Sequence, residues 1–298
     1  MPALNPQDLL EDSKCYACLG VSLYDQLRLA LLDVIAQGGG AGGGFSYAPD
    51  SAIVTWTDNN GAGQTGDLAY FNANADYATV TILTIEYETL TSISNIGSSF
   101  PMLNELHLHY TGLPAVDLSN LGALTYLDLS YNSITTVDLS ECPNLERLFL
   151  GYCPITSVDV STLTSLIQLD VSSTNIPSLD ISNLTNLTEA FAWYCGSLST
   201  LLFSNTPSLY YIAVPWCNLS TIDENNLTSA ITQLLLNDNN IASVAKVDTI
   251  FAKVNSFGTG MGGYRIYLDG GTNAAPTGST LNPDVMALGS RGWIVVIN

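Results

Sequence analysis

The sequence is short of basic residues and of charge altogether. Of its 298 residues only 7 are Lys or Arg and 2 are His, against 27 Asp or Glu, which gives a formal net charge of -20. Charged residues make up 11%, so Ser, Thr, Asn and Gly must supply most of the polar surface. Because a chain this acidic repels phosphate, we expect no nucleic-acid partner and no attraction to anionic membranes.

Other common signals are missing as well. No apolar run approaches the roughly 20 residues of a membrane span, so membrane insertion is not expected. The first residues, MPALNPQDLLEDSK, lack the basic start and apolar core of a secretory signal, which favours synthesis without a cleaved signal. There is no GxSxG, no HExxH and no phosphate-binding glycine loop. We therefore expect no catalytic residues, no enzymatic activity and no cofactor.

The strongest feature is an internal repeat. The pattern LxxLxLxx(N/C/T)x(L/I) recurs seven times at steps of 21 or 22 residues, beginning at Leu103 and ending with the copy from Ile231. In LxL the two apolar side chains point to one side of a strand and the middle one to the other. One coil cannot bury its apolar face alone, so the coils must stack into a solenoid. We predict a mainly β solenoid of about 7–9 coils with caps.

The inward positions form regular rows. One row is expected to contain Leu106, Leu127, Leu148, Leu169, Ala190, Ile212 and Leu234. Each coil continues as VDLS or similar, which also alternates, so the convex side is expected to be extended with little helix. Four cysteines fall on inward positions and are predicted to be buried free thiols: Cys142, Cys153, Cys195 and Cys217.

The pattern resembles the leucine-rich-repeat family, at the short end of its repeat lengths, over about residues 80–270. The resemblance implies a binding surface and not catalysis. It also implies a third inward row whose side chains satisfy backbone groups where the chain leaves each strand. That row is Thr111, Asn132, Cys153, Thr174, Cys195, Cys217 and Asn239.

The ends of the chain differ from the repeats and predict separate segments. These are a helical anchor module (1–37), a Gly-rich linker (38–44), an N-terminal cap with degenerate first coils (45–101), the repeats (102–254) and a C-terminal cap (255–298). Residues 45–66 are expected to form a strand, a turn and a strand. Residues 243–254 have helical spacing, and a final strand is expected to place Trp293 over the last coil.

The N-terminal module has an amphipathic pattern. Residues 22–37 are predicted to be a helix whose apolar face carries Leu23, Leu27, Leu31 and Val34. Because 37 residues are too few to fold alone, this module must dock on the solenoid, on sister copies or on a larger assembly. Cys15 and Cys18 form CYAC, which favours packing of the module over a redox pair or zinc shared between copies.

A second resemblance concerns both ends. Residues 9–37, followed by the glycines, look like the N-termini of proteins encoded in tailed-bacteriophage and prophage structural regions. GGTNAAPTG at 270–278, followed by an RGW strand, is similar to the end of phage-associated repeat proteins. This resemblance implies a virion protein, homo-oligomeric on the particle, whose residues 1–37 bind other virion proteins or sister copies. The solenoid would then bind a host-surface protein or glycan, or decorate the particle. The alternative is a bacterial surface or secreted adhesin.

The outward positions on the concave face are rich in aromatic residues. An exposed aromatic row suits stacking on sugar rings or anchoring a protein partner. The alternative is that the rings only stabilise adjacent coils. The candidate ligand-binding residues are Tyr110, Tyr131, Tyr152, Phe149, Phe191, Trp193, Tyr194 and Trp216.

Two polar patterns have a metal interpretation and a simpler one. His107 and His109, with Asp128 on the next coil, are either part of a zinc site or an ordinary polar surface. The outward row Asp117, Asp138, Asp159, Asp180 and Asp223 either bridges calcium or caps nearby turn amides and hydroxyls. In both cases the sequence favours the simpler interpretation, and we predict no metal site.

Overall fold

The computed structural model describes residues 53–58, 63–67, 77–85, 90, 93, 96–257 and 264–297. The chain divides into two compact units, Met1–Ser46 and Tyr47–Asn298, and the described residues all belong to the second. The predicted helical module and linker therefore lie outside the described residues, together with Cys15, Cys18, Leu23, Leu27, Leu31 and Val34.

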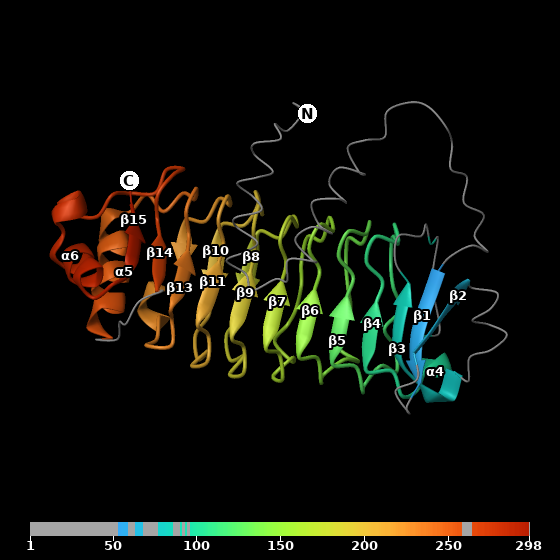
Figure 1. The fold of residues 1–298 in the computed structure, drawn as a ribbon. Helices are drawn as coiled ribbons and strands as arrows, with labels where there is room; N and C mark the ends of the chain where they lie inside the picture. Colours follow the sequence, from blue (N-terminus) through green and yellow to red (C-terminus); the bar gives the residue numbers. More distant parts are fainter. Residues whose placement is uncertain are drawn as a thin grey trace, which may run out of the picture. The chain divides into compact units, whose positions relative to one another are not determined.

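The second unit is built on one long sheet, in which twelve of the described strands lie side by side (Figure 1). Their order is β15-β14-β13-β11-β9-β7-β6-β5-β4-β3-β1-β2. The first three strands in the chain are β1 (Ile53–Asp58), β2 (Gly63–Asp67) and β3 (Val80–Ile85). The repeat strands are β4 (Glu105–His107), β5 (Tyr126–Asp128), β6 (Arg147–Phe149), β7 (Gln168–Asp170), β9 (Glu189–Phe191), β11 (Tyr211–Ala213) and β13 (Gln233–Leu235).

The register of this sheet confirms the predicted solenoid. From β3 to β15 each strand pairs in parallel with its neighbour, and Leu106, Leu127 and Leu148 lie directly beside one another. All three leucines are fully buried, so they form one row of a continuous core. At the N-terminal edge β1 pairs antiparallel with both β2 and β3, which agrees with the predicted strand, turn and strand.

The side of each coil opposite the long sheet is extended. Three short parallel strands form a second sheet there: β8 (Ser178–Asp180), β10 (Thr200–Leu202) and β12 (Thr221–Ile222). Residues 101–243, all described, contain no α-helix and one 3-10 turn, Glu224–Asn226. This confirms the expectation of little helix on that side, since the VDLS segments alternate as strands do.

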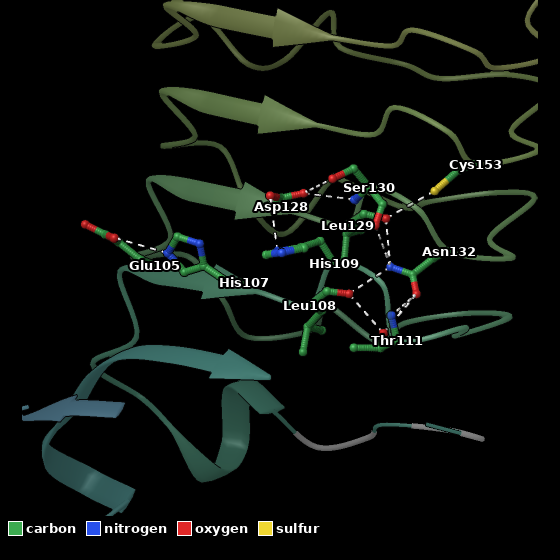
Figure 2. A network of polar contacts seen from close by, with 10 residues as sticks. All are labelled: Glu105, His107, Leu108, His109, Thr111, Asp128, Leu129, Ser130, Asn132 and Cys153. Carbon is green, nitrogen blue, oxygen red and sulfur yellow. Dashed lines mark hydrogen bonds and ion pairs between the residues drawn. The ribbon is translucent and has the colours of Figure 1, made fainter. Parts of the chain in front are cut away.

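The third inward row satisfies the backbone where the chain leaves each strand. The Asn132 side chain (6% exposed) accepts hydrogen bonds from the amides of Thr111 (3.2 Å) and Leu113 (2.9 Å). It donates to the carbonyls of Leu108 and Leu129, both at 2.8 Å, so it joins two coils (Figure 2). Cys153 donates from Sγ to the same Leu129 carbonyl at 3.1 Å. All four cysteines predicted to be buried thiols are free, and Cys142, Cys153 and Cys195 are buried, whereas Cys217 is partly exposed.

The C-terminal cap adds two helices and two strands, which lie at one end of the sheet (Figure 1). They are α5 (Val244–Ser256), β14 (Arg265–Tyr267), α6 (Pro283–Ser290) and β15 (Ile294–Val296). Helix α5 and the final strand agree with the predictions, and Trp293 is buried against Tyr264, with ring centroids 4.9 Å apart.

Helix α6 was not predicted. It starts where the Asn282 side chain accepts hydrogen bonds from the amides of Asp284 and Val285, followed by Pro283 at the first position. A short helix α4 (Ile96–Ser99) precedes the first repeat. None of the helices in the described part of the chain has the length and apolar character that crossing a membrane requires.

Candidate functional site

Each repeat strand is followed, three residues after its last residue, by a residue in the left-handed conformation. We call these seven positions the aromatic row, since five of them carry aromatic rings: Tyr110, Tyr131, Tyr152, Ser173, Tyr194, Trp216 and Asp238. Their φ angles lie between 54° and 58°. This conformation costs an L-residue about 1–2 kcal/mol and is uncommon for bulky side chains. The coil turn imposes it, and the rings are thereby aligned on one edge of the sheet.

The rings of the aromatic row form two stacks. Tyr110 and Tyr131 have centroids 4.2 Å apart and an interplanar angle of 19°, and Tyr131 and Tyr152 are 4.1 Å apart at 8°. Tyr194 and Trp216 form the second stack, 4.7 Å apart at 6°. The alternative that the rings stabilise adjacent coils is thus realised within each stack.

The row is interrupted at its middle by Ser173. The two tyrosines that flank this serine, Tyr152 and Tyr194, are exposed by 38% and 43%. The other three rings of the row are less exposed. Tyr152 and Tyr194 are therefore the most exposed rings of the aromatic row.

The other predicted aromatic residues differ in their exposure. Phe149 is half-buried and lies 5.4 Å from Tyr126. Phe191 and Trp193, predicted as outward ligand-binding residues, are only 5% and 6% exposed, and this part of the prediction needs correction. They lie in an aromatic group on the outer surface of the sheet, where Phe191 meets Tyr211 edge-on at 5.2 Å. Such a group is an expected result of large rings on neighbouring coils.

Polar contacts at the first repeats involve both histidines. His107 Nε2 lies 3.3 Å from Glu105 Oε2, and the ring stacks on Tyr126 at 4.4 Å. His109 Nδ1 lies 3.6 Å from Asp128 Oδ2, so the two imidazoles face different carboxylates (Figure 2). Among the described residues no three His, Cys, Asp or Glu side chains are grouped as metal ligands would be. Tyr126 was missed, although it lies two residues before the outward Asp128 and so on the same strand face.

Two outward carboxylates, Asp128 and Asp170, each accept a hydrogen bond from the amide two residues later. The distances are 2.9 Å from Ser130 and 2.8 Å from Ser172. Burial raises the pKa of Asp170, because desolvation outweighs the hydrogen bonds from Ser172, and the charge of Asp128 adds to the effect. Asp170 lies on the same coil as Ser173, three residues before it in the sequence.

The acidic row on the opposite side is capped locally. Asp117, Asp138, Asp159 and Asp180 each accept a hydrogen bond from the amide of the serine two residues later, at 2.9–3.0 Å. Hydrogen bonds from Ser140 and Ser161 lower the pKa values of Asp138 and Asp159. This is the local capping that the sequence favoured over calcium bridging.

Comparison with known proteins agrees with this geometry. Residues 122–163 match the family model described as leucine-rich repeats in two copies, and no curated protein matches the sequence. The functional domain of InlJ from Listeria monocytogenes is similar at 21% identity with a TM-score of 0.54, covering 65% of this chain and 47% of that one. A leucine-rich-repeat protein of Leptospira interrogans is 17% identical with a TM-score of 0.47, covering 65% and 56%.

These likenesses concern the fold. The chain spans about half the length of those two structures. At 21% identity the InlJ domain supports a leucine-rich-repeat solenoid and carries no residue-level role to this sequence.

Proposed function

We propose that this leucine-rich-repeat protein binds a macromolecular partner through the outer surface of its long sheet, with the aromatic row at the centre of the contact. The observation that carries the proposal is the pair of tyrosines at the interruption, 38% and 43% exposed although each is aligned with a ring stack. Exposed aromatic rings held rigidly are typical anchors of protein interfaces. Rings in a strained turn conformation lose little freedom on binding, which favours affinity.

The charges on this surface favour a partner that is not anionic. Glu105, Asp128, Asp170 and Glu189 face outward from the strands, against the single exposed cation Arg147 on the same repeats. With a net charge of -20 the whole chain would repel phosphate-rich ligands. A protein partner with basic residues, or a neutral glycan, fits these charges.

A photo-crosslinking experiment tests the binding role. A benzophenone amino acid replaces Tyr152 in the full chain, and a matched variant carries it at exposed Thr156 on the other side of the same coil. Both are irradiated in extracts of the producing cells and with purified phage particles. Adducts from position 152 that are absent from position 156 support a specific contact at the aromatic row. Equal labelling, or none from either position, would refute it.

We further propose that the protein is a virion component of a tailed phage, anchored through residues 1–37 and displaying the solenoid. The support is the resemblance of residues 9–37 and 270–278 to chains from phage structural regions. Mass spectrometry of purified particles is the test, with a non-structural phage protein as the contamination control. Enrichment with the major structural proteins supports the virion role. If the chain is absent from the particles, the virion role is refuted and the alternative, a bacterial surface or secreted adhesin, is favoured.

A further inference from the structure

We infer that Cys195 and Cys217 form a site of oxidative modification, a pair of thiols that a small-molecule disulfide or a peroxide converts into a stabilising bond between two coils. The inference is independent of the proposed binding role. Both cysteines belong to the third inward row, and both are free in the structure. Among the described cysteines they are the only two at equivalent positions on consecutive coils, because Thr174 stands in the row between Cys153 and Cys195.

The backbone brings the two cysteines together. Phe191 and Ala213 are paired in the parallel register of β9 and β11, and each cysteine follows one member of this pair by four residues. The register continues beyond the strands, since the Tyr194 amide donates to the Pro215 carbonyl at 3.1 Å. Neighbouring strands lie about 4.8 Å apart, and disulfides join residues whose Cα atoms are about 4.4–6.8 Å apart. The pair therefore meets the backbone requirement for a disulfide.

The two side chains are already in contact. The Cys195 amide donates to Cys217 Sγ at 3.3 Å, and the two thiols are hydrogen-bonded to each other. Cys195 Sγ lies 3.2 Å from the Val171 carbonyl and Cys217 Sγ lies 2.9 Å from the Ala192 carbonyl, so both sulfurs are held beside the backbone where the coils turn. Formation of the bond requires the sulfurs to approach from this contact to about 2.05 Å.

The pair holds one proton between its two sulfurs. The hydrogen bond from Cys217 lowers the pKa of Cys195, and the same bond raises the pKa of Cys217, because the two thiols share it. Transfer of the shared proton to Cys195 leaves the charge on Cys217, which is partly exposed whereas Cys195 is buried. The thiolate is the form of cysteine that attacks a disulfide, so a reagent should react first at Cys217.

Glutathione disulfide is an oxidant with which the electrons of this reaction balance. The Cys217 thiolate attacks one sulfur of the reagent, forms a mixed disulfide and releases one glutathione. The Cys195 thiol then loses its proton and attacks the Cys217 sulfur, so the protein disulfide forms and the second glutathione leaves. The two protein thiols lose two electrons and two protons, and glutathione disulfide is reduced to two glutathione molecules. Hydrogen peroxide would give the same bond and two molecules of water.

Peptide mapping of the full chain after oxidation tests the inference. The reduced protein is incubated with glutathione disulfide, the remaining free thiols are blocked with iodoacetamide in urea, and the chain is cut with chymotrypsin. Trypsin cannot separate the two cysteines, since no Lys or Arg lies between them. We expect peptides joined through Cys195 and Cys217, while Cys142 and Cys153 are alkylated. The oxidised protein should have a urea midpoint about 1 M higher than the reduced one, because the crosslink restricts the unfolded chain.

Threonine variants provide the controls, since the row already contains threonine on two coils. Cys217→Thr should lose both the joined peptides and the rise in the urea midpoint, whereas Cys153→Thr should keep both. Thiols of the pair that stay free, or Cys217 joined only to glutathione, would overturn the inference. A bond from either cysteine to Cys15 or Cys18, or an oxidised form less stable than the reduced one, would also overturn it. The crosslinks from position 152 test the proposed function separately.

Discussion

Replacing Asn132 by Ala should destabilise the solenoid more than any change on its surface. This side chain connects two coils through buried hydrogen bonds to the amides of Thr111 and Leu113 and to the carbonyls of Leu108 and Leu129. Alanine removes these four bonds at once. The carbonyls of Leu108 and Leu129 keep the bonds from the Thr111 hydroxyl (2.9 Å) and the Cys153 thiol (3.1 Å), whereas the buried amides of Thr111 and Leu113 lose this acceptor.

The magnitude follows from those groups. A buried donor or acceptor left without a partner costs about 1–3 kcal/mol, and some of this is recovered when water enters or the turn relaxes. We therefore expect a loss of about 3–5 kcal/mol in the free energy of unfolding, at the upper end for single substitutions. With a urea dependence of about 2–3 kcal/mol per molar, the unfolding midpoint falls by about 1–2 M.

Urea unfolding followed by circular dichroism measures this change. The stability of Asn132→Thr should lie between that of Asn132→Ala and that of the original chain. A threonine in this row can keep one of the bonds, as Thr174 does with its hydroxyl to the Val171 carbonyl at 2.7 Å. Asn144→Ala is the surface control: its amide donates to the Gly122 carbonyl at 2.7 Å in an exposed position, where water replaces the lost bond. If Asn132→Ala cost less than about 1 kcal/mol, or no more than Asn144→Ala, the proposed role of the third row would be wrong.

Three further predictions concern titrating groups. Burial raises the pKa of Cys142 to about 12 and that of Cys153 to about 11, so neither thiol should react with iodoacetamide at pH 8 until urea unfolds the chain. Peptide mapping measures the labelling of each cysteine, and labelling of either one in the folded protein would contradict the prediction. Asp170→Asn should raise the urea midpoint of unfolding at pH 7. Because burial raises the pKa of Asp170 in the folded state, the original protein loses stability as pH rises above the pKa of that group in the unfolded chain, and the two proteins should be equally stable near pH 3. Asp138→Ala should have the opposite effect. Because the pKa of Asp138 is lowered in the folded state, its carboxylate stabilises the fold above pH 4, so the variant should have a lower urea midpoint than the original at pH 7 and the same midpoint at pH 2.

The period of the repeat was sufficient to predict the core. Alternation in LxL places Leu127 inside and Asp128 outside, and this is what the strand β5 shows. The role of the third row followed from the resemblance to leucine-rich repeats, in which this position binds backbone groups, and Asn132, Thr111 and Cys195 make such bonds in the structure. Helix α6 shows the limit of reading periodicity alone: its apolar pattern is short, and the signal was the Asn-Pro cap at 282–283.

The exposure of individual rings could not be predicted from the pattern. Alternation assigns Phe191 and Trp193 to the outer surface, but it says nothing about how large side chains on adjacent coils cover each other. In the structure Phe191 meets Tyr211 and Trp193 lies 6.0 Å from Trp216, so both become buried without joining the main core. The left-handed φ of the aromatic row was equally hidden, since tyrosine is not a residue that normally indicates such a turn.

The conformational strain of the aromatic row is itself an argument about function. Glycine or asparagine would occupy the left-handed positions at lower cost, as Asn120, Asn183 and Asn205 do in turns elsewhere in the coils. Stacking can offset this cost for the rings that have an aromatic neighbour on both sides, and Tyr131 is the clearest case. Tyr152 stacks on Tyr131 and Tyr194 on Trp216, and these two tyrosines are more exposed than the other rings of the row. Bulky, exposed aromatic residues kept at strained positions therefore favour the proposed binding role of the aromatic row.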